Sequence, residues 1–319
     1  MAFTMGDTTP PPTGTVQRAS KMVERLGVPT KITTPPSTQY LMRYIITVFL
    51  LFAAWIVHLY QNPEFKGTPL RARLRGMLKS VGTKTKRAGK AAKEIERKTF
   101  HLCGLLVPLV YMVLLSNGLA TEKECALLCW AITVCGWTFD ICRVKFDAVR
   151  QLVKASPFGK IFRKEEEAKL TGACFFSLGN TLAVTLFPPA IAVTSLLFLV
   201  LGDMSAAIVG VAFGGETVSL KLGRQGKKSA EGSIAMFLVC FVVGCTVFAK
   251  VHMREYAVFI GAAVATLTEL NEPFGINDNL SIPLASSVAM TWAFARIASC
   301  ERDADAQELY DEYFATWIG

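Results

Sequence analysis

The sequence predicts an all-α protein that crosses a membrane several times, as a bundle of about seven to eight helices. Apolar residues make up 52% of its 319 residues and charged residues only 18%. The 23 residues between Lys98 and Glu122 carry no formal charge. The 46 residues between Lys169 and Glu216 carry only Asp203. Because about 20 apolar residues span a bilayer, tracts of this length exclude an ordinary soluble domain.

Runs of uncharged residues define eight candidate spans. They lie at approximately 41–60, 101–119, 125–142, 170–187, 190–213, 232–250, 256–270 and 280–299. Pro188-Pro189 separates the fourth span from the fifth and predicts a tight turn, because proline does not easily continue a helix. The third and seventh spans are short and end in acids, Asp140 and Glu269.

The predicted organisation has five parts. They are a disordered tail at 1–40, a first span at 41–60, a basic loop at 61–98, a membrane domain at 99–299 and an acidic tail at 300–319. The N-terminal tail is poor in acids, so an organelle transit peptide is the alternative interpretation. Leu70, Leu74 and Leu78 recur at helical spacing among cations of the basic loop. This pattern favours either a helix lying on anionic headgroups or a solvated linker.

Charge asymmetry predicts the orientation of the chain. Residues 61–100 carry twelve Lys or Arg against three acids, whereas the tail after Arg296 carries six acids against Arg302. The positive-inside rule places the long basic loops in the cytosol. The net charge of +9 therefore comes from loops between spans, which argues against nucleic acid as a partner.

The nine cysteines fall mostly in or beside apolar runs, and no two have CxxC spacing. We interpret them as small buried hydrophobic residues. The sequence predicts neither a disulfide framework nor a zinc site.

Asp203 is the strongest candidate functional residue, because an ionisable group inside a membrane span is costly. Small residues surround it, among them Gly202 and Gly210, and they would let another backbone or a phosphate approach closely. A carboxylate here could hold Mg²⁺ that bridges nucleotide phosphates. The alternative is a helix-packing motif in which Asp203 pairs with a neighbouring cation.

A basic segment with small residues precedes the sixth span and includes Lys227, Lys228 and Ser229. Lysine charge and backbone access suit a phosphate, and Ser229 or Ser233 could cap the following helix. The segment is not a P-loop, because no glycine lies five positions before Gly226. The alternative is that these lysines only determine topology.

Arg97, Lys98 and His101 stand where the first basic loop meets the second span. Arg97 and His101 share a helical face at i, i+4 spacing. Arginine could clamp a phosphate with two hydrogen bonds, and histidine could transfer a proton near neutral pH. The alternative for His101 is an ordinary residue of the membrane interface.

Three more polar groups fall on the same predicted face of the membrane. They are Asp140 with Arg143, Arg163 with Lys164, and the oxygen-rich loop of Glu269, Asn277, Asp278 and Asn279. The charge rule did not use the acids and amides among these groups, yet it assigns all of them to one side. A phosphoryl-transfer site at the cytosolic interface accounts for that convergence.

The order and spacing of these motifs resemble the CTP-dependent membrane lipid kinases, which include diacylglycerol, phytol and dolichol kinases. The resemblance runs from about Glu94 to Arg296. It is carried by Arg97-Lys98-x-x-His101, Asp140 with Arg143, Arg163-Lys164-Glu165, Thr171-Gly172, Leu178-Gly179, Gly202-Asp203 with Ala206 and Gly210, Lys228-Ser229-x-x-Gly232-Ser233, Glu269, and Asp278-Asn279-x-x-Ile282-Pro283. The spacing is most similar to the diacylglycerol kinases of the endoplasmic reticulum.

The resemblance implies CTP as phosphoryl donor, diacylglycerol as acceptor and Mg²⁺ as cofactor, in the endoplasmic reticulum membrane with a cytosolic catalytic face. A plastid envelope is the alternative location, phytol or dolichol the alternative acceptor, and a CDP-diacylglycerol synthase-like enzyme the alternative reaction. Two departures from the family pattern concern nucleotide contacts. Val211 stands where a basic residue is usual, and Asn277 where an acid is common.

From the residues and the resemblance together, we expect three kinds of site residue. The catalytic residues are Asp203, Arg97, Lys98 and His101. The nucleotide or phosphate contacts are Gly202, Gly210, Lys227, Lys228, Ser229, Arg163 and Lys164. The metal ligands are Asp203, Glu269 and Asp278.

Overall fold

The computed structural model describes residues 102–155, 169–214, 221–223, 228–249, 251, 253–271 and 275–318, with isolated positions 72, 76, 79, 89 and 98. Positions 154–155, 221–222 and 301–318 are described by their backbone alone. The elements in chain order are η2 (Cys103–Leu105), α5 (Leu106–Ser116), α6 (Glu122–Lys145), α7 (Asp147–Ala155), α8 (Gly172–Leu186), α9 (Pro189–Leu197), η5 (Phe198–Gly202), α10 (Asp203–Phe213), β1 (Lys221–Leu222), β2 (Lys228–Ser229), α11 (Ala230–Val247), α12 (Arg254–Asn271) and α13 (Asp278–Ile318). Within this part of the chain the fold is all-α apart from β1 and β2, which pair antiparallel with Lys221 opposite Ser229.

Four of the described helices are long and apolar enough to cross a membrane. They are α6, the continuous helix Pro189–Phe213, α11 and the Asp278–Cys300 part of α13. Two further predicted spans are shorter apolar helices, Cys103–Ser116 and Gly172–Leu186, and the seventh corresponds to α12. Each of these seven predicted spans therefore contains a helix, while a count of seven to eight membrane crossings is not confirmed.

Several predictions fall on parts of the chain that the structure leaves undescribed. The first span at 41–60 and the tail at 1–40 lie outside the described residues, as does nearly all of the basic loop at 61–98 with its interfacial helix.

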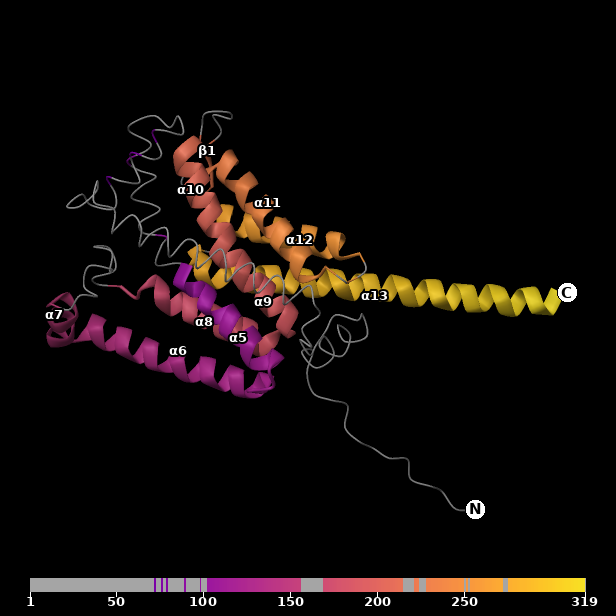
Figure 1. The fold of residues 1–319 in the computed structure, drawn as a ribbon, viewed down its shortest axis with the longest axis horizontal. Helices are drawn as coiled ribbons and strands as arrows, with labels where there is room; N and C mark the ends of the chain where they lie inside the picture. The colour runs from indigo at the N-terminus through magenta and orange to yellow at the C-terminus, as the bar shows by residue number, and fades with distance from the viewer. Residues whose placement is uncertain are drawn as a thin grey trace, which may run out of the picture.

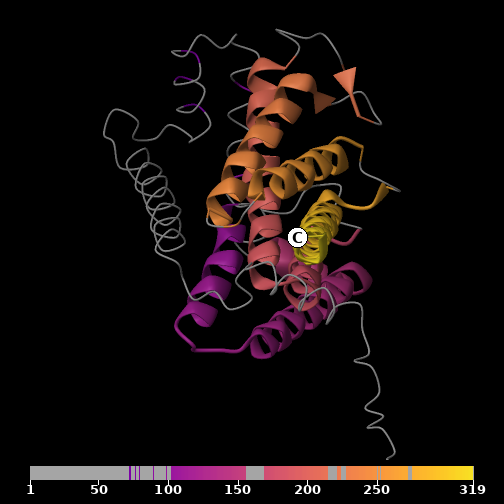
Figure 2. The same cartoon turned by 90° about the vertical axis from the view of Figure 1, so that its right-hand side faces the viewer.

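The helix from Pro189 to Phe213 forms the centre of the bundle (Figures 1 and 2). Every residue of α9 is buried. One apolar cluster joins this helix to α11, α12 and α13, and a second joins it to α5, α6 and α8. Pro188 and Pro189 start the helix directly after α8, so the predicted tight turn is confirmed.

A π-helical turn interrupts this central helix at η5, immediately before Asp203. Such a turn inserts one residue into the helix and changes the direction of the side chains that follow, and it is frequent at functional sites. No feature of the apolar sequence had predicted it. The turn therefore affects the direction in which the side chain of Asp203 points from the helix.

All nine cysteines are free. Cys125, Cys174 and Cys240 are buried, as predicted, but Cys103 and Cys135 are exposed. The prediction of burial is wrong for these two, because apolar composition does not distinguish a side chain in the protein core from one on the outer surface of a membrane helix. α6 illustrates this, since Leu127 and Ile132 are also exposed there.

Candidate functional site

Lys98 and Asp203 form a buried ion pair. The ammonium of Lys98 donates a hydrogen bond to Oδ2 of Asp203, and the two residues are 8% and 5% exposed. Lys98 precedes η2, whereas Asp203 begins α10 directly after the π-helical turn. A buried charge is costly unless it is paired. Lys98, itself a predicted site residue, is therefore the neighbouring cation that was the alternative partner for Asp203.

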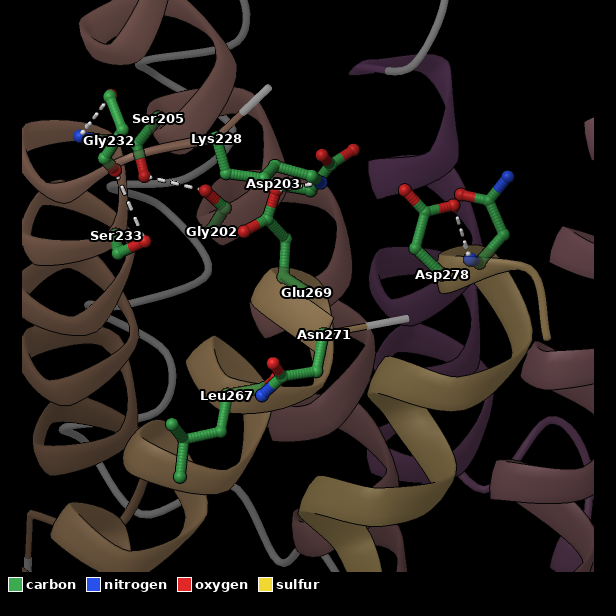
Figure 3. A network of polar contacts seen from close by, with 12 residues as sticks. Gly202, Asp203, Ser205, Lys228, Gly232, Ser233, Leu267, Glu269, Asn271 and Asp278 are labelled. Atoms are coloured by element: carbon green, nitrogen blue, oxygen red, sulfur yellow. Dashed lines mark hydrogen bonds and ion pairs between the residues drawn. The ribbon is translucent and has the colours of Figure 1, made fainter. Parts of the chain in front are cut away.

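Lys228 and Glu269 form a second ion pair beside the first. Lys228 lies in β2 and donates to Oε1 of Glu269, which is buried near the end of α12. Burial opposes the charged form of Lys228, but the neighbouring carboxylates of Glu269, Asp278 and Asp203 together outweigh it and raise the pKa of the lysine above its ordinary value. Figure 3 shows both side chains directed toward Asp203. Lys228 therefore stays protonated at neutral pH.

Asp278, the first residue of α13, adds a third carboxylate. It interacts electrostatically with Asp203, Lys98 and Lys228, and Glu269 interacts electrostatically with both aspartates. Figure 3 shows Asp278 on the helix next to Glu269. Five charged groups from five segments of the chain thus form one cluster, with two ammonium groups among three carboxylates. We call Lys98, Asp203, Lys228, Glu269 and Asp278 the charged cluster.

The charged cluster offers hard oxygen donors of the kind that Mg²⁺ binds. Within the part of the chain that the structure describes, no three His, Cys, Asp or Glu side chains lie close enough together to hold an ion by themselves. Mg²⁺ commonly takes one or two carboxylates and completes its shell with water and substrate phosphates. The donor set therefore fits a cation that arrives with a nucleotide.

The start of α13 is fixed against α8. The backbone N–H of Asn279 donates to Oδ1 of Asp278 at 2.9 Å, and its side-chain Nδ2 donates to the carbonyl of Gly172 at 3.2 Å. Gly179 allows the close approach, because a Cβ at this position would lie 2.5 Å from the carbonyl oxygen of Asn279. These residues are motif members in the sequence, but no pattern in the sequence predicted their contact.

Glycines let α10 and α11 pack backbone against backbone. A Cβ at Gly232 would lie 2.7 Å from the carbonyl oxygen of Ala206, and one at Gly202 would lie 2.6 Å from Sγ of Cys240. Gly210 lies in the same contact, where a Cβ would be 3.0 Å from Oγ of Ser229. The small residues were predicted to allow the approach of another backbone or of a phosphate. In the structure they allow the approach of another backbone.

Ser229 caps α11. Its Oγ accepts a hydrogen bond from the N–H of Gly232 at 3.2 Å, so the predicted cap is confirmed. The cap directly follows Lys228, and the same hydroxyl packs against Gly210 and Gly214. The α10–α11 contact therefore also fixes the strand that carries Lys228 toward the charged cluster.

A further buried ion pair lies within α6, where this helix meets the start of α8. Nε of Arg143 donates to Oδ1 of Asp140 at 2.6 Å, and Oδ2 of Asp140 accepts the backbone N–H of Thr171 at 2.8 Å. Asp140 is 4% exposed and Arg143 2%. Both were predicted as charges on the same face as Asp203, but the structure gives them partners of their own.

The structure thus brings together five of the predicted site residues as the charged cluster, with Gly202, Gly210 and Ser229 packed beside it. The remaining predicted site residues lie outside the described part of the chain: Arg97, His101, Arg163, Lys164 and Lys227.

Comparison with known proteins identifies relatives that match part of this chain. An uncharacterized protein of Rickettsia prowazekii is 30% identical over 204 residues, which cover 62% of this chain and 93% of that protein. The CTP-dependent diacylglycerol kinase 1 of Saccharomyces cerevisiae is 26% identical over 219 residues (62% of this chain, 72% of the kinase). That of Schizosaccharomyces pombe is 27% identical over 164 residues (47% and 72%). No family model and no solved structure matches the chain.

Proposed function

We propose that this protein is a CTP-dependent lipid kinase acting on diacylglycerol. The chain belongs to one family with the uncharacterized rickettsial protein, and it is homologous to the fungal CTP-dependent diacylglycerol kinases. The acceptor hydroxyl attacks the γ-phosphorus of CTP and loses its proton to solvent, the bond from that phosphorus to the β–γ bridging oxygen breaks, and CDP and phosphatidate leave. Homology supports the kinase and CTP. The choice of diacylglycerol as acceptor rests on the names of the fungal relatives. Phytol and dolichol are the alternative acceptors.

The observation that carries the proposal is the charged cluster itself. Phosphoryl transfer requires positioning and neutralisation of the phosphate charge more than covalent chemistry by the protein. Lys98 and Lys228 supply ammonium donors, and Asp203 and Asp278 supply carboxylates, in a region where unpaired charge is costly. A purely structural role would need one compensated pair. Two pairs and a further carboxylate in one place support a site for a charged substrate.

Binding of Mg·CTP would exchange the partners within the cluster. The phosphate oxygens would take the ammonium groups of Lys98 and Lys228, and the cation would take Asp203 and Asp278. Glu269, which we expected as a third metal ligand, bonds to Lys228, and this contact supports a role in orienting the lysine. Mg²⁺ bound with the nucleotide supplies neutralisation of charge on the transferred phosphoryl group.

The other predicted site residues keep their proposed roles. Arg97 clamps a phosphate, His101 transfers a proton or donates a hydrogen bond, and Arg163, Lys164 and Lys227 neutralise the nucleotide. We further propose that the catalytic face is cytosolic, in the endoplasmic reticulum membrane or, should the N-terminal tail be a transit peptide, in a plastid envelope.

The test is an assay of the purified full-length protein with γ-labelled CTP or ATP and a panel of diacylglycerol, phytol and dolichol. The proposal expects labelled phosphatidate with CTP and Mg²⁺, and little product with ATP. Product from a polyprenol or phytol alone would overturn the acceptor. A CDP-lipid as product would overturn the kinase in favour of a cytidylyltransferase.

A further inference from the structure

α6 packs on the rest of the protein through Cys125, Ala126 and Cys129 and through a series of polar contacts with α8. Most of its apolar side chains are exposed, and its buried residues are Cys125, Thr133, Asp140 and Arg143. The Thr133 hydroxyl is 2.7 Å from the hydroxyl of Thr181 on α8. In a membrane, hydrogen bonds between helices stabilise association that apolar contacts alone do not provide. We call the row of polar contacts that joins α6 and α8 along their length the ladder.

The ladder continues along α8 toward its N-terminus. Nε1 of Trp137 donates to the carbonyl of Cys174 at 2.9 Å. One turn further along α6, Asp140 accepts the N–H of Thr171, and Arg143 donates to Asp140 and to the carbonyl of Lys169 at 2.8 Å. Charged side chains, those of Asp140 and Arg143, take part only in these last contacts, at the start of α8.

The same end of α8 contacts Asn279, the residue that follows Asp278 of the charged cluster. The carbonyl of Gly172, the residue after Thr171, accepts from Nδ2 of Asn279, and Asn279 follows Asp278 directly. The backbone N–H of Asn279 donates to Asp278 Oδ1. A continuous set of contacts thus leads from Arg143 and Asp140 through the start of α8 to a carboxylate of the cluster.

We propose that Asp140 and Arg143 are positioning residues for Asp278. Their ion pair holds the backbone at the start of α8 so that the carbonyl of Gly172 meets Asn279, and Asn279 in turn orients the carboxylate of Asp278 toward Asp203 and the two lysines. The inference rests on the proposed function, because Asp278 matters for catalysis only if the cluster transfers phosphate.

The position of the charges along the ladder supports this role over simple attachment. Two threonines suffice to join α6 and α8 in the middle of the interface, at a much lower desolvation cost than a buried ion pair. The ion pair lies instead beside Thr171, the residue before Gly172, whose carbonyl accepts from Asn279. A displacement of about 1 Å at a reacting centre can cost on the order of 100-fold in rate. A rigid start of α8 would therefore favour catalysis.

The test compares Asp140→Asn, Asn279→Ala and their double variant with the control Thr133→Val, which cuts the ladder away from the cluster. Asp140→Asn and Asn279→Ala should each lower kcat about 10- to 100-fold. The double variant should fall no further than the stronger single variant, because both act through one contact. Thr133→Val should lower the melting temperature while kcat per folded protein stays near wild type.

Melting temperatures of all variants separate positioning from folding. Asn279 is half-buried at a helix start, so Asn279→Ala should remain folded even if Asp140→Asn does not. Additive losses in the double variant, or an Asn279→Ala enzyme with wild-type kcat, would overturn the positioning role while leaving the kinase intact. A wild-type protein that phosphorylates no lipid with CTP would overturn the proposed function itself.

Discussion

The ammonium of Lys98 binds the carboxylate of Asp203, 105 residues further along the chain, and both side chains are nearly fully buried. Removing one partner leaves the other charge buried, which costs about 3–5 kcal/mol. We therefore expect Lys98→Met to lower both melting temperature and activity. The double variant Lys98→Met/Asp203→Asn should regain melting temperature without regaining activity, as measured on detergent-purified protein. Recovery of both would mean that the pair is structural only.

Lys228 should contribute to stability over a defined pH range. Burial opposes its charge, but Glu269, with Asp278 and Asp203, outweighs burial and raises its pKa above the ordinary 10.5. A group with a raised folded pKa stabilises fully below its unfolded pKa, and the contribution is lost as pH rises through the folded value. The melting temperature of Lys228→Met should be lower than wild type at pH 8, and the difference should shrink above pH ~10.5.

The exposed lysine Lys123 on α6 offers the matched control for Lys228. Lys123→Met should leave the melting temperature unchanged at both pH values, and the activity as well. Lys228→Met should in addition raise the KM for CTP, because an ammonium donor to phosphate is lost. An unchanged KM would remove Lys228 from the nucleotide site.

The contact between α10 and α11 should tolerate no side chain at Gly232. A Cβ there would lie 2.7 Å from a backbone carbonyl of α10, so Gly232→Ala should force the helices apart and destabilise by about 1–3 kcal/mol. Gly136→Ala on α6 is the control, because nothing lies within 4 Å of a Cβ at that position. It should be neutral or stabilise by about 0.5–1 kcal/mol. Equal melting temperatures for the two variants would contradict the packing.

Both loops at the charged cluster should face the same side of the membrane. Single cysteines at Gln225 and Asn277, in an active background without native cysteines, should react with an impermeant thiol reagent applied from the cytosolic side. A cysteine at Asn117, in the turn between α5 and α6 at the other end of the bundle, should react from the opposite side. Labelling of Gln225 and Asn277 from different sides would break the single-site account.

Some features of the fold and site could be predicted from sequence because their cause is local. Asp203 stands out as the one charge in a long apolar tract, and burying a charge is costly wherever the chain folds. Pro188-Pro189 marks a turn because proline lacks the N–H that a helix needs. Ser229 precedes an apolar run, where a hydroxyl satisfies the free N–H groups of a helix start.

Other features depend on contacts between distant segments, and no local pattern encodes them. The partner of Asp203 could not be predicted from the sequence, because many lysines precede a span and only packing selects Lys98. The π-helical turn at η5 lies in an apolar run without proline or polar residues. The bond between Asn279 and Gly172 joins residues 107 positions apart. The exposure of Cys103 depends on which helix face meets the outer surface.

Asp203→Asn tests most directly whether the charged cluster transfers phosphate. The substitution keeps the size of the side chain and removes its charge, so CTP-dependent lipid phosphorylation should be abolished because a carboxylate for the cation is lost. Expression, melting temperature and activity should be measured together on the purified variant. We expect a folded membrane protein without turnover. A well-folded and fully active Asp203→Asn protein would contradict the account.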